Sequence, residues 1–504
     1  MRKIPGTMAT QHPDNAFAPY WDKFGNPFIG AYQETTEAVT CFKDLGVSEY
    51  MWDWEGKHAD AAVIDRLFGE DFDYFKQHQL GRDKFLTFRI PNIWEEKGYN
   101  LLQAMTVILS GEDEARDLKF EQRPLFEVIL PMTERPEQLM RIHILFQRLA
   151  QFKSRDFTKK EADNDDYLEL IPLVESVESQ LGFDDLLEKY ATLHADHFGT
   201  KPKYIRPFLA FSDSSLSSGL LAGALGNKLA LSRLYEFSDR TGIPVYPIAG
   251  PGSLNFRGGL KPSPESVERF LTEFPGVRTV TVQSSFRYDH PKAAVKAAIR
   301  QLEEGLPRTK PRLIDAADQK VLVNIIEHSA KLYKNTLDAI APAMKKAFAG
   351  IPKRRDRKQH IGLLAYSRSM GGQELPRAIT FTASFYSIGV PPEFIAAGRT
   401  LKALSPHELE VLRKVYPGVA DDYAAAGRYL NLANLQEFAG GSADWEAILE
   451  DIESIQEVLG IELGPDTKDE QRHCELSAQL IKLTDGADSA KLLTEMAELR
   501  RSLG

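Results

Sequence analysis

The stretch VYPIAGPGSLNFRGG, from Val245 to Gly259, starts as a short apolar run and ends in a loop that contains four glycines and one arginine. Its start, VYPIAG, predicts a buried strand. Because glycine adopts positive φ and lets the backbone approach a ligand, a glycine-rich turn after such a strand suits an anion pocket. Arg257 adds a permanent forked cation that matches phosphate or carboxylate. The loop lacks the Walker and dinucleotide-binding patterns, so for this stretch alone an ordinary strand-to-helix turn stays an equal alternative.

The same arrangement recurs along the chain, where short apolar runs end in polar residues and segments with helical periodicity separate them. We predict eight strands, in the ranges Tyr50–Lys57, Lys84–Asn92, Leu125–Glu134, Leu168–Ser176, Tyr204–Ser215, Val245–Ser253, Val277–Phe286 and Ile361–Ser369. We expect helices between them, for instance at Pro136–Gln151, Leu220–Thr241 and Pro264–Phe274. Alternating strands and helices imply parallel pairing with right-handed crossovers. Eight units predict an α/β fold, a closed (β/α)8 TIM-type barrel with its chemistry at the carboxyl ends of the strands. An open, doubly wound sheet stays possible, because periodicity does not report closure.

Extensive additional α-helices are expected outside those units. The segment through about Gly30 is rich in Pro, Asn and Gly and is predicted to be an ordered loop. A long helix is expected at Asp315–Phe348, and the basic run Lys353–Lys358 is predicted to be a solvated loop. We therefore divide the chain into residues 1–375, the loop plus the barrel, and residues 376–504, a helical region packed on it as one unit. Helix breaks in the second part are expected at Pro391–Pro392, Gly418 and Gly440–Gly441.

Composition excludes several classes of protein. The 504 residues are 43% hydrophobic and 27% charged, which is ordinary for a globular protein. A net charge of −10 at pH 7 argues against a nucleic-acid partner. Two cysteines, Cys41 and Cys474, are too few for a disulfide framework and fit a reducing cytosol. Without an apolar run of membrane-spanning length or an apolar leader, we expect a cytoplasmic enzyme with no membrane partner.

Polar residues at the carboxyl ends of the predicted strands would meet at one mouth of the barrel. They are Asp53, Glu55, Lys57, Arg89, Glu175, Asp213, Arg257, Gln283 and Arg368. Glu175 and Asp213 form a pair of hard oxygen ligands that suits Mg²⁺ or Mn²⁺. Arginines around such an ion match a substrate with phosphate and carboxylate groups. The alternative is that these side chains form ordinary structural salt bridges. Taken together, the residues alone indicate a metal-dependent enzyme that acts on a small anion.

Five motifs, TQHPDN, IPLVES, FLAFSDSS, GPGSLNFRGG and SR…LPRAI, together resemble the phosphoenolpyruvate carboxylase family, in its short archaeal-type branch. The resemblance extends from His12 to about Gly398 with the motifs in the family's order. It implies a lyase that joins bicarbonate to phosphoenolpyruvate, giving oxaloacetate and phosphate. It also implies a (β/α)8 barrel wrapped in helices, a requirement for Mg²⁺ or Mn²⁺, no biotin, and a homotetramer.

The resemblance assigns roles residue by residue. His12 matches the catalytic histidine of the family, and Arg257 matches the arginine that guards the carboxylation step. Glu175 and Asp213 match the two metal carboxylates. The substrate-binding residues that the resemblance implies are Arg89, Arg368, Arg377, Lys57 and Gln283, the last two by a looser match.

The reaction expected of these residues passes through carboxyphosphate and a metal-stabilised enolate of pyruvate. Arginines and the ion would position the phosphoryl group for attack by bicarbonate. His12 would then take the proton of carboxyphosphate, releasing CO₂ beside the enolate. Arg257 would hold the carboxyl fragment against carbon, and the loop bearing His12 would close over the mouth with the glycine loop to exclude water.

Two departures from the longer family members leave alternatives open. Leu216 stands where they have a lysine, and Pro251 stands where they have a second arginine. The candidates to replace those charges are Lys57, Arg206, Lys261 and Arg287. The chain ends in RRSLG, without the asparagine that binds an inhibitory amino acid in longer members, so inhibition by aspartate does not follow from the resemblance. The rival functions are another metal-dependent, enolate-forming barrel lyase or aldolase and a non-catalytic barrel scaffold; a requirement for bicarbonate separates them from the carboxylase.

Overall fold

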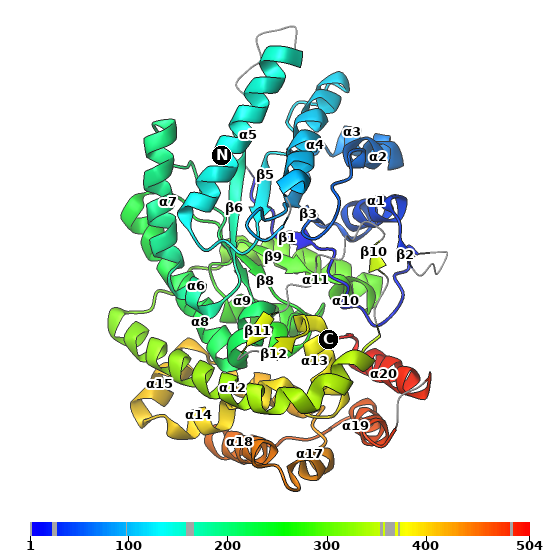
Figure 1. Cartoon of the computed structure of the whole chain (residues 1–504), viewed down its shortest axis with the longest axis vertical. Helices are drawn as coiled ribbons and strands as arrows, with labels where there is room; N and C mark the ends of the chain where they lie inside the picture. Colours follow the sequence, from blue (N-terminus) through cyan, green and yellow to red (C-terminus); the bar gives the residue numbers. More distant parts are fainter. Residues whose placement is uncertain are drawn as a thin grey trace.

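A closed parallel barrel forms the centre of the chain (Figure 1). The computed structural model describes residues 3–22, 28–96, 98–157, 166–352, 356–357, 368–370, 373–483 and 487–504. In order around the barrel, the strands are β1 (Thr7–Ala9), β3 (Glu49–Asp53), β4 (Phe85–Arg89), β5 (Glu127–Leu130), β6 (Glu169–Val174), β7 (Phe208–Ala210), β8 (Ile248–Gly250) and β9 (Thr279–Val282). The predicted (β/α)8 barrel is confirmed, and the open sheet is excluded.

Seven of the eight predicted strands are confirmed, but the eighth prediction, Ile361–Ser369, is wrong as a barrel strand. Its place is taken by β1, which pairs with β9 on one side and with β3 on the other and so closes the ring. Residues 361–367 lie outside the described residues. Arg368–Met370 forms β11, which pairs antiparallel with β12 (Gln373–Leu375). β1 was missed because Thr7–Ala9 lies in a segment rich in Pro, Asn and Gly and is not part of a longer apolar run.

Helices cover the outside of the barrel, as predicted. Those between β1 and β9 are α1 (Ala31–Val39), the π-helix η1 (Thr40–Leu45), α2 (Val63–Glu70), α3 (Phe72–Gln77), α4 (Gly98–Asp117), α5 (Pro136–Phe157), α6 (Val177–Leu181), α7 (Phe183–Phe198), α8 (Ser212–Thr241), the 3₁₀ turn η2 (Asn255–Arg257) and α9 (Pro264–Glu273). After β9 come α10 (Ser284–Tyr288), α11 (Lys292–Gly305) and η3 (Leu306–Arg308). Local signals explain their bounds: the Ser263 side chain caps α9 and proline occupies its first turn.

The remaining helices lie together in the lower half of Figure 1. They are α12 (Ala316–Gly350), α13 (Ala378–Ser387), η4 (Pro392–Phe394), α14 (Ala397–Ala403), α15 (Pro406–Val415), α16 (Val419–Gly427), α17 (Leu432–Ala439), α18 (Ala443–Leu459), α19 (Lys468–Leu480) and α20 (Ala487–Arg500). The long helix predicted from Asp315 is α12, and the predicted breaks fall between α-helices, with Pro392 starting the 3₁₀ turn η4. Of the basic run, only Asp356–Arg357 is described, as β10 pairing with β2 (Phe28–Ile29).

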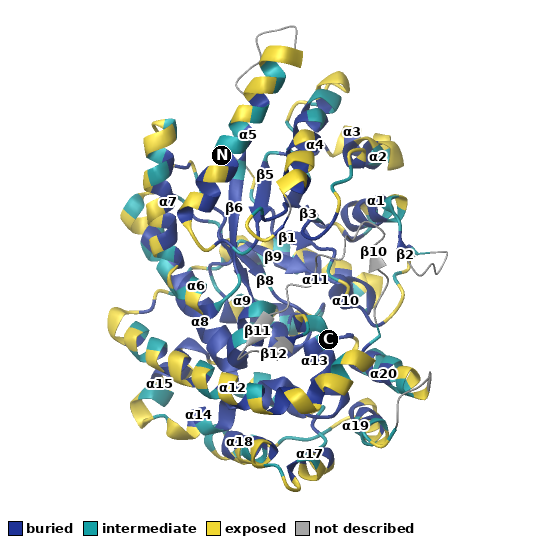
Figure 2. Cartoon of the chain, in the orientation of Figure 1, coloured by how far each residue is buried: buried dark blue, intermediate teal, exposed yellow. Residues whose placement is uncertain are grey.

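Three hydrophobic clusters hold these layers together. One lies inside the barrel, a second joins the strands to the helices from α1 to α11, and a third joins α8 and α12 to the helices from α13 to α18. Figure 2 shows that the barrel strands are buried. The inner cluster consists of Met8, Met51, Ile129, Ile171, Leu173, Phe208, Ala210 and Ile248. The division at residues 375 and 376 stays a prediction. In the described part of the chain, no helix is both long enough and apolar enough to cross a membrane.

A buried ion-pair cluster closes the amino end of the barrel. Arg206 precedes β7, and its guanidinium donates to Glu49 (3.0 and 2.7 Å) and to Glu127 (2.6 Å), the first residues of β3 and β5. It also donates to Thr279 Oγ1 at 3.0 Å. This is the end opposite to the one predicted to hold the site, so the interpretation of Arg206 as a substitute anion ligand is wrong. Its position before a strand, rather than after one, explains the difference.

Replacing Arg206 with methionine leaves two buried carboxylates without their cation. Because Arg206, Glu49 and Glu127 are at most 2% exposed, we expect Arg206→Met to lower the free energy of unfolding by about 3–5 kcal/mol, measured by guanidinium denaturation. The control is Arg240→Met, which breaks a half-exposed pair with Glu188 and is expected to cost less than about 1 kcal/mol. Equal stabilities of the two variants would contradict the role of this cluster.

Candidate active site

The carboxyl ends of the strands bring most of the predicted site residues to one rim. Asp53 and Arg89 end β3 and β4, and Glu175 follows β6 directly. Asp213 lies in the first turn of α8, directly after β7. Arg257 ends η2 after β8, and Gln283 caps α10 after β9. The predicted gathering of these residues is confirmed; their chemical roles are taken up below.

Arg89 is the electrostatic centre of the rim. Its guanidinium donates to both oxygens of Asp53, at 2.9 and 2.6 Å, and lies 3.0 Å from Glu55. Burial alone would raise the pKa of Asp53, but the Arg89 guanidinium holds this pKa well below its usual range. For Glu55, burial prevails and raises the pKa. Burial alone would lower the pKa of Arg89, but Asp53 and Glu55, with a smaller contribution from Glu175, raise it above its usual range.

His12 lies in the segment that leaves β1, where its Nδ1 is 3.0 Å from Thr10 Oγ1. Burial lowers the pKa of the imidazole to about 3; Arg89 and Arg257 add to this effect, while Asp53 and Asp213 oppose it. The ring is therefore neutral near pH 7. The interaction with Asp213 also means that the histidine shares the rim with a carboxylate predicted to bind metal.

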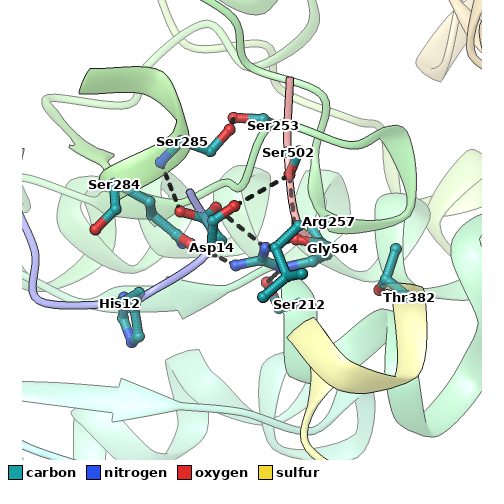
Figure 3. A network of polar contacts seen from close by, with 12 residues as sticks. His12, Asp14, Ser212, Ser253, Arg257, Ser284, Ser285, Thr382, Ser502 and Gly504 are labelled. Carbon is teal, nitrogen blue, oxygen red and sulfur yellow. Dashed lines mark hydrogen bonds and ion pairs between the residues drawn. The ribbon is translucent and has the colours of Figure 1, made fainter. Parts of the chain in front are cut away.

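Arg257 is 2% exposed, and four protein groups hold its guanidinium (Figure 3). Nε donates to Ser212 Oγ at 3.0 Å, and Nη2 donates to Gln283 Oε1. Nη1 donates to Asp14 Oδ2 at 3.1 Å and to the main-chain oxygen of Gly504. The glycine loop thus presents an arginine whose orientation is defined by segments from four parts of the chain.

Two glycines make this position of Arg257 possible. A Cβ on Gly252 would lie 2.8 Å from the Arg257 Cζ, so the guanidinium packs against bare backbone. Gly258 has a φ of 107°, which L side chains rarely adopt. The predicted need for glycine is confirmed, but at Gly252 the close approach is made by the chain's own arginine.

The other predicted substrate-binding residues have different surroundings. Lys57 is 1% exposed; its ammonium donates to Gln11 Oε1 at 2.9 Å and lies 3.5 Å from Glu34. Arg377 is exposed and acts electrostatically on Glu55, so it lies near the Arg89 cluster. The backbone of Arg368 belongs to β11, and its side chain lies outside the described residues.

Leu216 and Pro251 are the two departures from longer family members, and neither side chain carries a charge. Leu216 is 1% exposed on α8 and belongs to the apolar cluster with α12. Of the candidates to replace the missing charges, Arg287 is fully buried, where it donates to the Thr10 oxygen at 2.5 Å and to Glu37 at 3.1 Å. It therefore secures the segment bearing His12. For Lys261, another of these candidates, burial lowers the pKa and so disfavours the charged ammonium.

Sequence reasoning missed two residues of the TQHPDN motif. Gln11 Oε1 accepts hydrogen bonds from the Asp53 N–H and from Lys57, which ties the N-terminal segment to β3. Asp14 binds Arg257. Both residues lie in the same motif as His12, and this was the available signal. A single sequence does not show that Asp14 pairs with Arg257, which lies 243 positions further along the chain.

Glu175 and Asp213 have the chemistry expected of magnesium ligands. They follow the adjacent strands β6 and β7, which pair through Leu173 with Phe208 and Val174 with Leu209. Among the described residues, no group of three or more His, Cys, Asp or Glu side chains gathers as a metal site. Two carboxylates with substrate oxygens and water can complete the six oxygen ligands of Mg²⁺, so the donor set fits the ion.

A parallel barrel with arginines, a neutral histidine and paired carboxylates on its carboxyl rim defines an enzyme that acts on a small anionic substrate. The comparisons with known proteins give the family: the chain belongs to the phosphoenolpyruvate carboxylases, whose family profile matches residues 4–504. The family resemblance seen in the motifs is thereby confirmed.

Relatives named phosphoenolpyruvate carboxylase match along the full chain. The protein from Leuconostoc mesenteroides is 54% identical over 505 residues, covering 100% of this chain and 99% of its own. The protein from Oenococcus oeni is 50% identical with the same coverage. The one from Metallosphaera sedula is 34% identical over 521 residues, covering 100% of both chains. Archaeal and short-type relatives are among the matches, as the predicted branch requires.

A buried carboxyl group supports the glycine loop from the C-terminal helices. Glu393 is 1% exposed and accepts hydrogen bonds from the Phe256 N–H at 2.7 Å and from Tyr386 at 2.6 Å. Burial raises the pKa of Glu393 from 4.5 to about 7. The folded chain therefore keeps a proton that the unfolded chain loses between those pH values.

Because the folded pKa of Glu393 is raised, the stabilisation is present at low pH and is lost as the pH rises from about 4.5 to 7. Glu393→Gln preserves the shape without titrating. We expect guanidinium denaturation at pH 5 and pH 7.5 to show a larger loss of stability for the wild type than for Glu393→Gln, by at most about 3 kcal/mol. Identical pH dependences of the two proteins would contradict this assignment.

Proposed function

We propose that this chain catalyses the carboxylation of phosphoenolpyruvate by bicarbonate, giving oxaloacetate and phosphate as a carbon–carbon lyase. The observation that supports it best is the gathering of His12, Arg89 and Arg257 on one rim of a barrel that matches the carboxylase family over residues 4–504. In this proposal, bicarbonate attacks the phosphoryl group, and carboxyphosphate and the enolate of pyruvate follow.

Arg89 is the proposed anchor of the substrate phosphate. It is a permanent cation at the end of β4, and it already binds the carboxylates of Asp53 and Glu55 in the geometry that a phosphate would use. Glu55 has a raised pKa because it is buried beside Asp53, so it is the weaker competitor for the guanidinium. Arg377, Arg368, Lys57 and Gln283 stay predictions as further substrate ligands; the described contacts of Lys57 favour a role in holding Gln11.

Glu175 and Asp213 are the proposed ligands of Mg²⁺ or Mn²⁺. When bound, the ion supplies Lewis acidity that stabilises the negative charge of the enolate. The two carboxylates themselves act on the neighbouring side chains, Glu175 on Arg89 and Asp213 on His12. Both are small contributions: Asp53 and Glu55 act more strongly on Arg89, and Asp53 acts more strongly on His12.

His12 is the proposed acceptor of the carboxyphosphate proton. Its neutral ring can take the proton from the carboxyl group, so that the bond from carbon to the bridging oxygen breaks and leaves CO₂ and phosphate. Arg257 then keeps the carboxyl fragment beside the enolate carbon. The buried residues around His12, including Gln11 and Asp14, limit access of water that would otherwise protonate the enolate to pyruvate.

We further propose a homotetramer located in the cytoplasm that works without biotin. These properties come from the family resemblance. Both cysteines, Cys41 and Cys474, are free thiols in the structure, which is consistent with a reducing compartment.

Omission of substrates tests the reaction directly. With phosphoenolpyruvate, Mg²⁺ and bicarbonate each left out in turn, and oxaloacetate followed through malate dehydrogenase, we expect product only when all three are present. His12→Asn and Arg257→Ala should make no oxaloacetate, because one lacks the proton acceptor and the other the carboxyl-holding cation. Bicarbonate-dependent pyruvate release by either variant would place its defect after phosphoryl transfer.

The outcome against the proposal is a folded, metal-loaded wild type that forms no oxaloacetate. Product formation from phosphoenolpyruvate without bicarbonate would instead favour another enolate-forming lyase. Absence of any turnover would favour a scaffold.

Direct ion binding tests the two carboxylates without reference to turnover. In Mn²⁺ titrations followed by the electron paramagnetic resonance of free Mn²⁺, we expect Glu175→Gln and Asp213→Asn to weaken binding by at least about tenfold. Glu178→Gln is the control, because Glu178 is exposed on the neighbouring helix α6 and should bind Mn²⁺ as the wild type does. Unchanged Mn²⁺ affinity in both site variants would place the ion elsewhere.

A further inference from the structure

Asp14 connects two parts of the rim that lie far apart in the sequence. It is fully buried, and its Oδ2 accepts the hydrogen bond from Arg257 Nη1 at 3.1 Å. Its Oδ1 accepts the Ser285 N–H at 2.7 Å, which fixes the carboxylate against the start of α10 (Figure 3). His12 precedes it by two residues, and Pro13 between them restricts the backbone. A displacement of Asp14 would therefore move His12 and also disturb the ion pair with Arg257.

The last residues of the chain complete the same network. The Leu503 N–H donates to the Asp14 main-chain oxygen at 2.8 Å, and the Gly504 oxygen accepts from Arg257. This segment is enclosed: Leu503 packs in a cluster that includes Ala16 and residues of α13, α19 and α20. A Cβ on Gly504 would lie 2.0 Å from the Ile379 oxygen. The 503–504 backbone thus contacts both Asp14 and Arg257.

The charge of Asp14 has a clear partner. Among the described residues, it is the carboxylate in an ion pair with Arg257, and the two side chains are 0% and 2% exposed. A buried guanidinium needs a counter-charge, and Asp14 supplies it through Oδ2 while Ser285 holds Oδ1. The orientation of Arg257 toward the rim therefore depends on Asp14.

We propose that Asp14 is a positioning residue that fixes Arg257 relative to His12 and so decides whether released CO₂ is captured by the enolate. The proposal rests on the carboxylation activity proposed above. CO₂ is neutral and weakly bound, so capture requires that it form where the enolate carbon lies within reach. Misplacement of a reacting group by about 1 Å costs up to about 10²-fold in rate. Loss of Asp14 should therefore affect the second half of the reaction more than phosphoryl transfer.

Asp289 offers a matched control. It is also buried, at 5% exposure, and it holds the same segment by accepting the N–H groups of Ala16 and Phe17 at 2.7 and 2.8 Å. If Asp14 only anchored the segment, Asp14→Asn and Asp289→Asn would have the same consequences. If Asp14 positions Arg257, only Asp14→Asn changes the fate of CO₂.

The test measures oxaloacetate, pyruvate and phosphate from phosphoenolpyruvate and bicarbonate with the full-length wild type, Asp14→Asn and Asp289→Asn. We expect Asp14→Asn to retain bicarbonate-dependent phosphate release and a near-normal KM for phosphoenolpyruvate. Its yield of oxaloacetate per phosphate should fall by at least about tenfold, with pyruvate making up the difference. Asp289→Asn should give the wild-type yield of oxaloacetate per phosphate, even if its overall rate of phosphate release is lower.

Gly504→Ala provides a second approach if Asp14→Asn does not fold. Its added methyl group must displace the 504 backbone from Ile379 and hence from Arg257, so the same fall in yield is expected. A wild-type yield in the folded Asp14→Asn or Gly504→Ala chain, or an equal fall in Asp289→Asn, would overturn the positioning role. A wild type that makes no oxaloacetate would instead overturn the carboxylase function, and the positioning role with it.

Discussion

The pairing of β1 with both β9 and β3 closes the barrel, and the arrangement of the rim depends on it. The pairing is reinforced outside the strand. Glu303 on α11 accepts the N–H groups of Gly6 and Thr7 at 3.2 and 2.9 Å, and Thr279 donates to the Pro5 oxygen at 2.6 Å. Because a parallel barrel directs every strand toward one end, the chain leaving β1 must enter the rim. Barrel closure therefore delivers His12 to the other rim residues.

Buried charge is handled differently at the two ends of the barrel. At the amino end, the two terminal nitrogens of Arg206 donate to two carboxylates and a threonine, all of them buried. At the carboxyl end, Arg89 pairs with Asp53 at the end of β3, and Arg257 pairs with Asp14 in the N-terminal segment. Anionic substrates can compete with such pairs, since a guanidinium binds phosphate and carboxylate by the same geometry. The amino end supports the fold, and the carboxyl end suits binding.

Much of the fold was predictable from the sequence because strands and helices of ordinary length leave periodic signals. The seven confirmed strands and the helix beginning after Asp315 have such signals. β1 was not predictable, because Thr7–Ala9 lies among Pro, Asn and Gly residues and, unlike the confirmed strands, has no longer apolar run around it. The rim was predictable in outline, since Glu175 and Asp213 directly follow strands. The partners of Arg257 were not, because Asp14 and Gly504 are each more than two hundred positions away and only the folded chain brings them together. Arg206 was misassigned although it lies near the start of the predicted strand Tyr204–Ser215, which indicated the amino end.

The most direct test of the central claim follows the oxygen atoms of bicarbonate. If bicarbonate attacks phosphorus to form carboxyphosphate, one of its oxygens must leave with phosphate, while the other two enter oxaloacetate. With ¹⁸O-labelled bicarbonate in unlabelled water, and reaction times short enough to limit exchange, mass spectrometry of the released phosphate should therefore detect one labelled oxygen per molecule. Phosphate without label, formed at the same rate as oxaloacetate, would contradict the carboxyphosphate route and the roles derived from it.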